Sequence, residues 1–78
     1  MPHIIVKVAT GKSEAQKTQL VGAIVKDVMD TLNLGEDPIS VGIEEFKPED
    51  WTEKVYKPDI KAKWETLYKK PGYDPLKK

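Results

Sequence analysis

The second residue of the chain is the first candidate for chemistry. The sequence begins MPHIIVKV, so a proline follows Met1 directly and an apolar run follows the proline. Methionine before a small residue is usually removed after synthesis, which would leave Pro2 with a free secondary amine. In an apolar setting the pKa of such an amine falls, because its charged form loses solvation, and it can then act as a general base near neutral pH. Alternatively, Pro2 has a structural role only, because proline is also tolerated as the first residue of a strand.

Other catalytic side chains are scarce. The chain has no cysteine and a single histidine, His3, so neither thiolate chemistry nor a multi-histidine metal site is available. No glycine-rich phosphate loop and no metal-ligand spacing is present. The serines Ser13 and Ser40 are better explained as a helix cap and a strand residue. We therefore expect no cofactor and no metal.

Size and charge narrow the class of protein further. The 13 basic residues, all lysines, balance 13 acidic ones over 78 residues, which argues against a nucleic-acid-binding module. No apolar run approaches the ~20 residues of a membrane span, and no signal-peptide pattern is present, so we expect a cytoplasmic protein. A chain this small buries only roughly 60–65% of its unfolded surface. Self-association is the remaining way to bury more, so we expect a homo-oligomer.

Periodicity predicts the elements that position these residues. Residues 3–9 alternate as a strand, with Ile4, Val6 and Val8 on one face. A helix should run from Ser13 to about residue 33, opened by a capping box in which Gln16 reaches back to Ser13. Residues 39–46 alternate again. A strand, a long helix and a second strand predict a right-handed βαβ unit with parallel strands.

The last third of the chain predicts helix. One or two turns should lie between Pro48 and Pro58, and Pro58 suits the first position of a further helix. That helix should end at Pro71-Gly72, with an apolar face made of Ile60, Trp64, Leu67 and Tyr68. We therefore predict an α+β fold in one domain, residues 1–78, with residues 74–78 as a flexible tail.

The order of these features resembles the 4-oxalocrotonate tautomerase family. The resemblance rests on proline at position 2, the strand HIIVKV, GKSEAQK at the opening of a long helix, and SVGIEEF. Pro48, Trp51 and KKPGY resemble the longer, PptA-type branch, so the likeness covers about residues 1–73. It implies a cofactor-independent keto–enol tautomerase that acts on a small 2-oxo acid, with Pro2 as the general base after removal of Met1.

The resemblance also assigns roles to particular positions. Lys12 stands where family members often carry an arginine that binds a substrate carboxylate, and Gly42 stands where the archetypal enzyme has a second arginine. Trp51 matches an aromatic position that keeps the site apolar, and His3, beside Pro2, is a further candidate for contact with substrate. Lysine is a point charge rather than a bidentate fork, so we expect a substrate other than 4-oxalocrotonate, with one carboxylate.

Strand length predicts how the site is assembled. Pro2 and Lys12 lie at opposite ends of the first strand, roughly 20 Å apart, so they cannot hold one small substrate within one chain. Two subunits with antiparallel first strands would bring Pro2 of one to Lys12 of the other. The longer branch favours a dimer, with a hexamer as the alternative. Two other functions stay open: a hydratase or dehalogenase of the same superfamily, and a non-catalytic homo-oligomeric binding protein.

Overall fold

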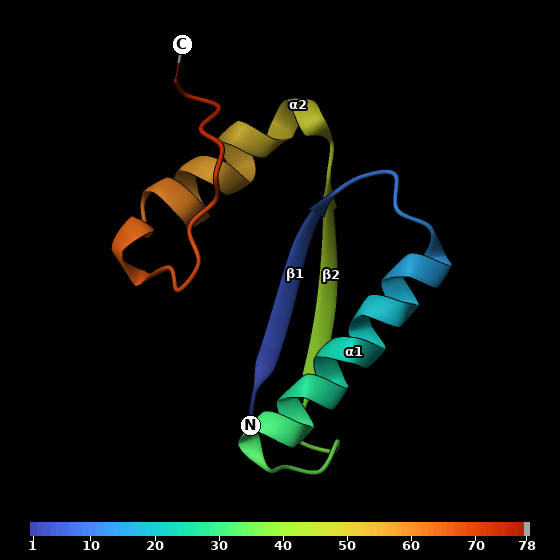
Figure 1. Ribbon diagram of the computed structural model, residues 1–78. Coiled ribbons are helices and arrows are strands. Elements are labelled where there is room, and N and C mark those ends of the chain that lie inside the picture. The colour runs from blue at the N-terminus through green and yellow to red at the C-terminus, as the bar shows by residue number, and fades with distance from the viewer. Residues whose placement is uncertain (78) are drawn as a thin grey trace. The chain divides into compact units, whose positions relative to one another are not determined.

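A computed structural model describes residues 1–77 and contains two compact units, which are described separately (Figure 1). The first unit, residues 1–45, contains β1 (His3–Ala9), α1 (Glu14–Leu32) and most of β2 (Ser40–Phe46). The second, from Phe46 onward, contains α2 (Pro48–Trp51), a π-helix η1 (Thr52–Lys61) and a 3₁₀ turn η2 (Trp64–Thr66). No helix of the described chain is both long and apolar enough to span a bilayer.

The first unit is the predicted βαβ unit. Its two strands are neighbours in a two-stranded sheet and run in the same direction, joined by α1 (Figure 1). The amide of Ser40 donates a hydrogen bond to the Pro2 carbonyl at 3.2 Å, so both strands start at the same level. The helix α1 faces both strands, since its Leu20 lines one hollow together with Val8 of β1 and Ile43 of β2.

Local chemistry sets both ends of α1. Ser13 and Gln16 form the predicted capping box: the Gln16 amide donates to Ser13 Oγ and the Ser13 amide donates to Gln16 Oε1, each at 3.0 Å. The helix ends at Asn33, which adopts the left-handed conformation with φ 56°. This conformation suits asparagine better than most residues, and it lets the amides of Asn33 and Leu34 reach the Met29 carbonyl.

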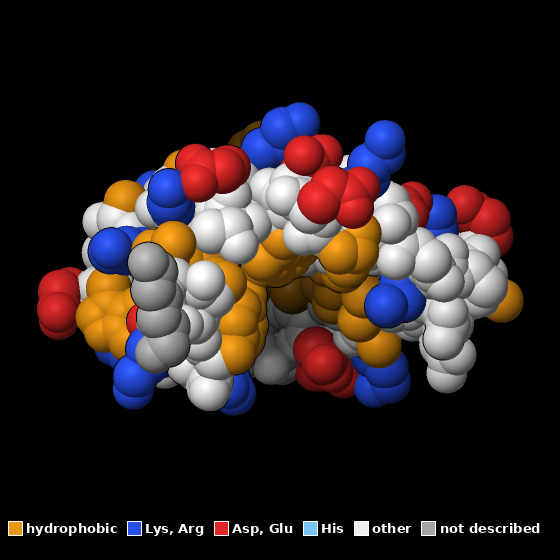
Figure 2. All heavy atoms as spheres, turned by 90° about the horizontal axis from the view of Figure 1, so that it is seen from above, with side chains coloured by type: hydrophobic (Ala, Val, Ile, Leu, Met, Phe, Trp, Pro, Cys, Tyr) orange, Lys and Arg blue, Asp and Glu red, His pale blue; other side chains and the backbone are white. Residues whose placement is uncertain are grey.

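The βαβ unit has no buried core of its own among the described residues. No side chain of α1 is buried, and Ile5, Leu20 and Leu32 are 50%, 41% and 55% exposed. Figure 2 shows hydrophobic side chains open to solvent beside lysine and acidic groups. In the described chain, the buried hydrophobic residues are Val55 and Tyr56, both in the second unit. An isolated two-stranded sheet is marginal in water, so these exposed apolar groups agree with an expected partner chain.

The predicted helix start at Pro58 is wrong. Helical structure runs from Pro48 to Lys61, and Pro58 lies inside the π-helix. Proline breaks an α-helix because it lacks the N–H and its ring meets the carbonyl four residues earlier. In a π-helix the hydrogen bonds reach five residues back, as from Ala62 to Lys57 at 3.0 Å, so the wider turn accommodates the ring.

The predicted helix up to residue 70 is also wrong. Between Lys61 and residue 77, where the described chain ends, the only further helical element is the short 3₁₀ turn η2, and Leu67 is already extended. Tyr68 is fully exposed, so it does not share an apolar face with Ile60, Trp64 and Leu67. The predicted tail, residues 74–78, ends in Lys78, which lies outside the described residues. Assignment of residues 1–78 to one domain stays a prediction.

The capping box supplies a test of the first unit. Ser13→Ala removes the acceptor for the Gln16 amide and should lower the free energy of unfolding by about 1 kcal/mol. Urea unfolding at fixed protein concentration measures this change. Gln19→Ala, at an exposed position of the same helix, is the matched control and should leave the midpoint nearly unchanged. Equal effects of the two substitutions would contradict the role of the cap.

Candidate active site

Pro2 lies immediately before β1 and is half-buried. Its carbonyl is held by the Ser40 amide, while Met1, on the other side of its nitrogen, is fully exposed. With Met1 attached, that nitrogen belongs to a peptide bond and has no basic lone pair. Removal of Met1 would convert it to a secondary amine without disturbing the hydrogen bond that fixes Pro2 to β2.

His3 is bound to the second strand beside Pro2. Its Nδ1 lies 2.6 Å from Ser40 Oγ, so Ser40 contacts both predicted site residues, one through its amide and one through its hydroxyl. The sequence pattern identifies Ser40 only as a strand residue and does not indicate this role. The alternation of apolar residues places His3 and Ser40 on the other face from the core-facing residues of their strands. If the two parallel strands are taken to start side by side, the sequence would place His3 next to Ser40.

Lys12 lies at the other end of β1, in the turn that leads to α1 (Figure 1). It lines a hollow of about 110 Å³ together with apolar and polar side chains of the same unit, namely Val8, Gln16, Lys17, Leu20 and Ile43. The seven residues of β1 separate Lys12 from Pro2, which corresponds to roughly 23 Å of extended chain. Within one chain the structure therefore does not bring these two residues together.

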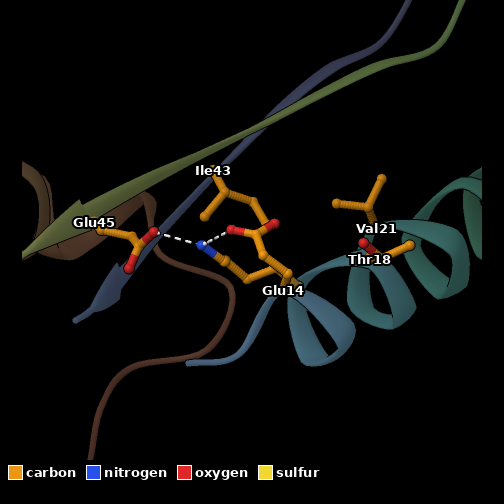
Figure 3. Close-up of a pocket in the computed structure, with 6 residues that line it drawn as sticks. Glu14, Thr18, Val21, Ile43 and Glu45 are labelled. Carbon is orange, nitrogen blue, oxygen red and sulfur yellow. Dashed lines mark hydrogen bonds and ion pairs between the residues drawn. The ribbon is translucent and has the colours of Figure 1, made fainter. Parts of the chain in front are cut away.

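Lys17, which also lines this hollow, already forms ion pairs with two carboxylates. Lys17 Nζ lies 2.8 Å from Glu14 and 2.7 Å from Glu45, within a pocket of about 330 Å³ (Figure 3). Hydrogen bonds to Glu14 and Glu45 raise the pKa of Lys17, so its charge is retained. This amine links the first turn of α1 to β2. Among residues 1–77, no ion pair holds Lys12, so Lys12 is the better candidate for binding an anion.

Trp51 is fixed by two aromatic neighbours in the second unit. Its ring packs edge-on against Phe46, with centroids 6.3 Å apart and an interplanar angle of 82°. Its indole Nε1 donates a hydrogen bond to Tyr73 Oη at 2.8 Å. The resemblance predicts Trp51 as a site residue, but the spacing of the three tyrosines gives no ground for choosing Tyr73 among them. The 22-residue separation of Trp51 and Tyr73 explains why no local pattern identifies their contact.

Tyr56 anchors this aromatic group. It is 3% exposed, and its ring lies 5.6 Å from that of Tyr73. Burial raises the pKa of Tyr56, and the carboxylate of Asp74 raises it further by charge and by a hydrogen bond with the phenol. The neutral, hydrogen-bonded phenol is therefore the form that the folded state favours.

Comparison with known proteins identifies the family. A family model described as "Tautomerase enzyme" matches residues 2–54, which is more than half of the chain and includes Pro2, His3, Lys12 and Trp51. The chain belongs to the tautomerase family. The predicted family and enzyme class are confirmed at this level.

Similar curated proteins cover nearly the whole tautomerase chain. The "Probable tautomerase" of Xylella fastidiosa (strain 9a5c) is 43% identical over 76 residues, which are 97% of this chain and 93% of that protein. "Tautomerase PptA" of Cronobacter sakazakii (strain ATCC BAA-894) is 35% identical over 75 residues, or 95% and 99% of the two chains. The resemblance to PptA-type proteins therefore extends through the second unit.

Solved structures support the fold. A chain from a study of the 4-oxalocrotonate tautomerase isozymes of Methylibium petroleiphilum superposes with a TM-score of 0.60 at 31% identity, over 62% of this chain and 75% of that one. A chain from an analysis of trans-3-chloroacrylic acid dehalogenase activity gives 0.61 at 20% identity, over 63% and 92%, which shows likeness of fold alone. The predicted α+β tautomerase fold is confirmed.

The raised pKa of Tyr56 predicts a loss of stability in alkali. The folded state holds the phenol proton more tightly than the unfolded chain, so this contribution is complete below about pH 10 and is lost as the pH rises through the folded pKa. Urea midpoints measured between pH 8 and pH 11 should fall at the alkaline end. Tyr56→Phe should reduce that fall, whereas Tyr68→Phe, at a fully exposed tyrosine, should not. An unchanged alkaline fall in Tyr56→Phe would contradict the assignment.

Proposed function

We propose that this tautomerase interconverts the enol and keto forms of a small 2-oxo acid, with the Pro2 amine as the general base. The observation that supports this most directly is the position of Pro2. Its carbonyl is anchored by Ser40, whereas its nitrogen side carries only the fully exposed Met1. Removal of Met1 would expose an amine that is already oriented by the sheet, and the proline ring would limit its rotation.

The proposed proton transfer needs no other reactant. The neutral amine takes a proton from the enol hydroxyl or the α-carbon, becomes an ammonium, and returns the proton at the other atom of the same system. The amine must be neutral near pH 7, which requires that water around it be restricted. Ile5, 50% exposed and on the same strand face as His3, is an apolar group that a second subunit would cover close to this amine.

We assign the substrate carboxylate to Lys12 of a neighbouring subunit. The length of β1 prevents Pro2 and Lys12 of one chain from binding one small molecule, whereas antiparallel β1 strands from two subunits would bring the two ends together. A homodimer is the smallest assembly that meets this requirement. A single lysine matches one carboxylate and would also stabilise developing enolate charge.

His3 and Trp51 have supporting roles in this proposal. His3, held by Ser40, would contact the substrate beside the amine. Trp51, half-buried and held by Phe46 and Tyr73, would form an apolar wall that excludes water.

The first test compares the state of the Pro2 nitrogen. Protein whose mass shows that Met1 has been removed should accelerate ketonisation of phenylenolpyruvate, followed by absorbance. The same sequence prepared with an inhibitor of methionine aminopeptidase carries an amide at Pro2 and should be slower by roughly 10²–10⁴-fold, the usual contribution of a general base. Pro2→Ala should also lose most of the activity. Equal rates for processed and unprocessed protein would refute the role of Pro2.

The second test asks whether the site is shared between subunits. Pro2→Ala and Lys12→Ala should each be weakly active alone. When the two are unfolded together and reassembled, a mixed dimer contains one site with both wild-type residues, so roughly a quarter of all sites should recover. The control mixture combines wild-type protein with Lys26→Ala, a substitution at an exposed lysine of α1. Its activity should be the same as that of wild-type protein alone. No recovery in the mixture would contradict a site built from two chains.

A further inference from the structure

The segment that follows η2 returns to α2 and η1 and makes specific contacts there. Its Tyr73 accepts the hydrogen bond from Trp51 Nε1 at 2.8 Å, and its Asp74 carboxylate contributes to the raised pKa of the buried Tyr56. The rings of Tyr56 and Tyr73 lie 5.6 Å apart. We call residues 71–77 the return segment (Figure 1). It therefore contacts Tyr56, which is one of the two buried hydrophobic residues described in the second unit.

The indole of Trp51 depends on this segment for its polar contact. Phe46 supplies an edge-to-face ring contact, which favours a ring plane but satisfies no donor. The indole N–H is a donor only, and a half-buried indole without an acceptor turns toward water or loses hydrogen-bond energy. Tyr73 supplies that acceptor. With Phe46 and Tyr73 together, both the plane and the direction of the indole are determined.

Tyr73 is well placed to hold the indole because its own position is constrained. The neighbouring Asp74 accepts a hydrogen bond through Oδ1 from the Leu76 amide at 2.9 Å, and its carboxylate helps to raise the pKa of the Tyr56 phenol. Tyr56 is 3% exposed, so this anchor lies in the interior of the unit. Tyr68, by contrast, lies before the return segment and is fully exposed.

We propose that Tyr73 is a positioning residue for the active site: it holds the Trp51 indole in the orientation that closes the apolar wall of the site. This inference rests on the proposed function, in which Trp51 excludes water from the Pro2 amine. Loss of the Tyr73 hydroxyl would let the indole turn and would admit water. The substrate would then bind more weakly, and the amine would regain solvation, which raises its pKa.

The first measurement needs no turnover. The chain has two tryptophans, so Trp64→Phe leaves Trp51 as the one indole N–H signal in the proton–nitrogen NMR spectrum. In that background Tyr73→Phe removes a single oxygen and keeps the ring beside Tyr56. The Trp51 N–H signal should move upfield and exchange with water at least several-fold faster. Tyr68→Phe is the matched control and should leave the signal in place.

The second measurement tests the connection to the active site. With phenylenolpyruvate, Tyr73→Phe should raise KM by about 2- to 10-fold, the range expected for one hydrogen bond, with a smaller change in kcat. The acid limb of the kcat/KM profile should shift to higher pH, because that limb reports the pKa of the base in the free enzyme. In a Trp51→Phe background the same substitution should have no further effect on either quantity.

The outcomes separate the two proposals. An unchanged indole signal in Tyr73→Phe overturns the positioning role, whatever the kinetics. An equal effect of Tyr73→Phe with and without Trp51 overturns it as well, because Tyr73 would then act by another route. A wild-type protein without enol turnover refutes the proposed function, and the NMR comparison still decides whether Tyr73 holds the indole.

Discussion

The pairing of β1 with β2 at their shared starting end holds Pro2 and His3 in place. The Ser40 amide binds the Pro2 carbonyl and the Ser40 hydroxyl binds His3, so one residue of β2 holds two residues of β1. A shift of register by one residue would move Ser40 to the other face of the sheet and break the contact with His3. The orientation of the proposed base is therefore a property of the sheet rather than of the chain end alone.

The length of β1 makes the proposed site depend on association with a second subunit. It holds Lys12 a full strand away from Pro2, so one chain offers a base at one end and a cation at the other. The same unit leaves Ile5, Leu20 and Leu32 substantially exposed and has no buried side chain in α1. A second copy would cover apolar surface and complete the proposed site in one step. Stability and activity would then share a single dependence on association.

The second unit orients the side chain of Trp51. Its buried residues, Val55 and Tyr56, lie in the π-helix, and the ring of Tyr56 packs against Tyr73 of the return segment. This small core holds Tyr73, and Tyr73 in turn holds the indole of Trp51. A tautomerase with this extension can therefore orient an aromatic side chain with residues that lie beyond the 2–54 span matched by the family model.

The sequence by itself determined the βαβ unit, because alternation in residues 3–9 and 39–46, helical spacing between them and the Ser13–Gln16 cap are local patterns. It also determined that Pro2 and Lys12 lie at opposite ends of one strand. Only the tertiary structure decided that Ser40 binds both Pro2 and His3, that helix continues through Pro58, and that Tyr73 holds Trp51. The physical reason is distance along the chain for the two side-chain contacts, which join residues 37 and 22 positions apart and leave no trace in local periodicity. For Pro58 the reason is the wider π turn, which removes the clash on which the expected break depended.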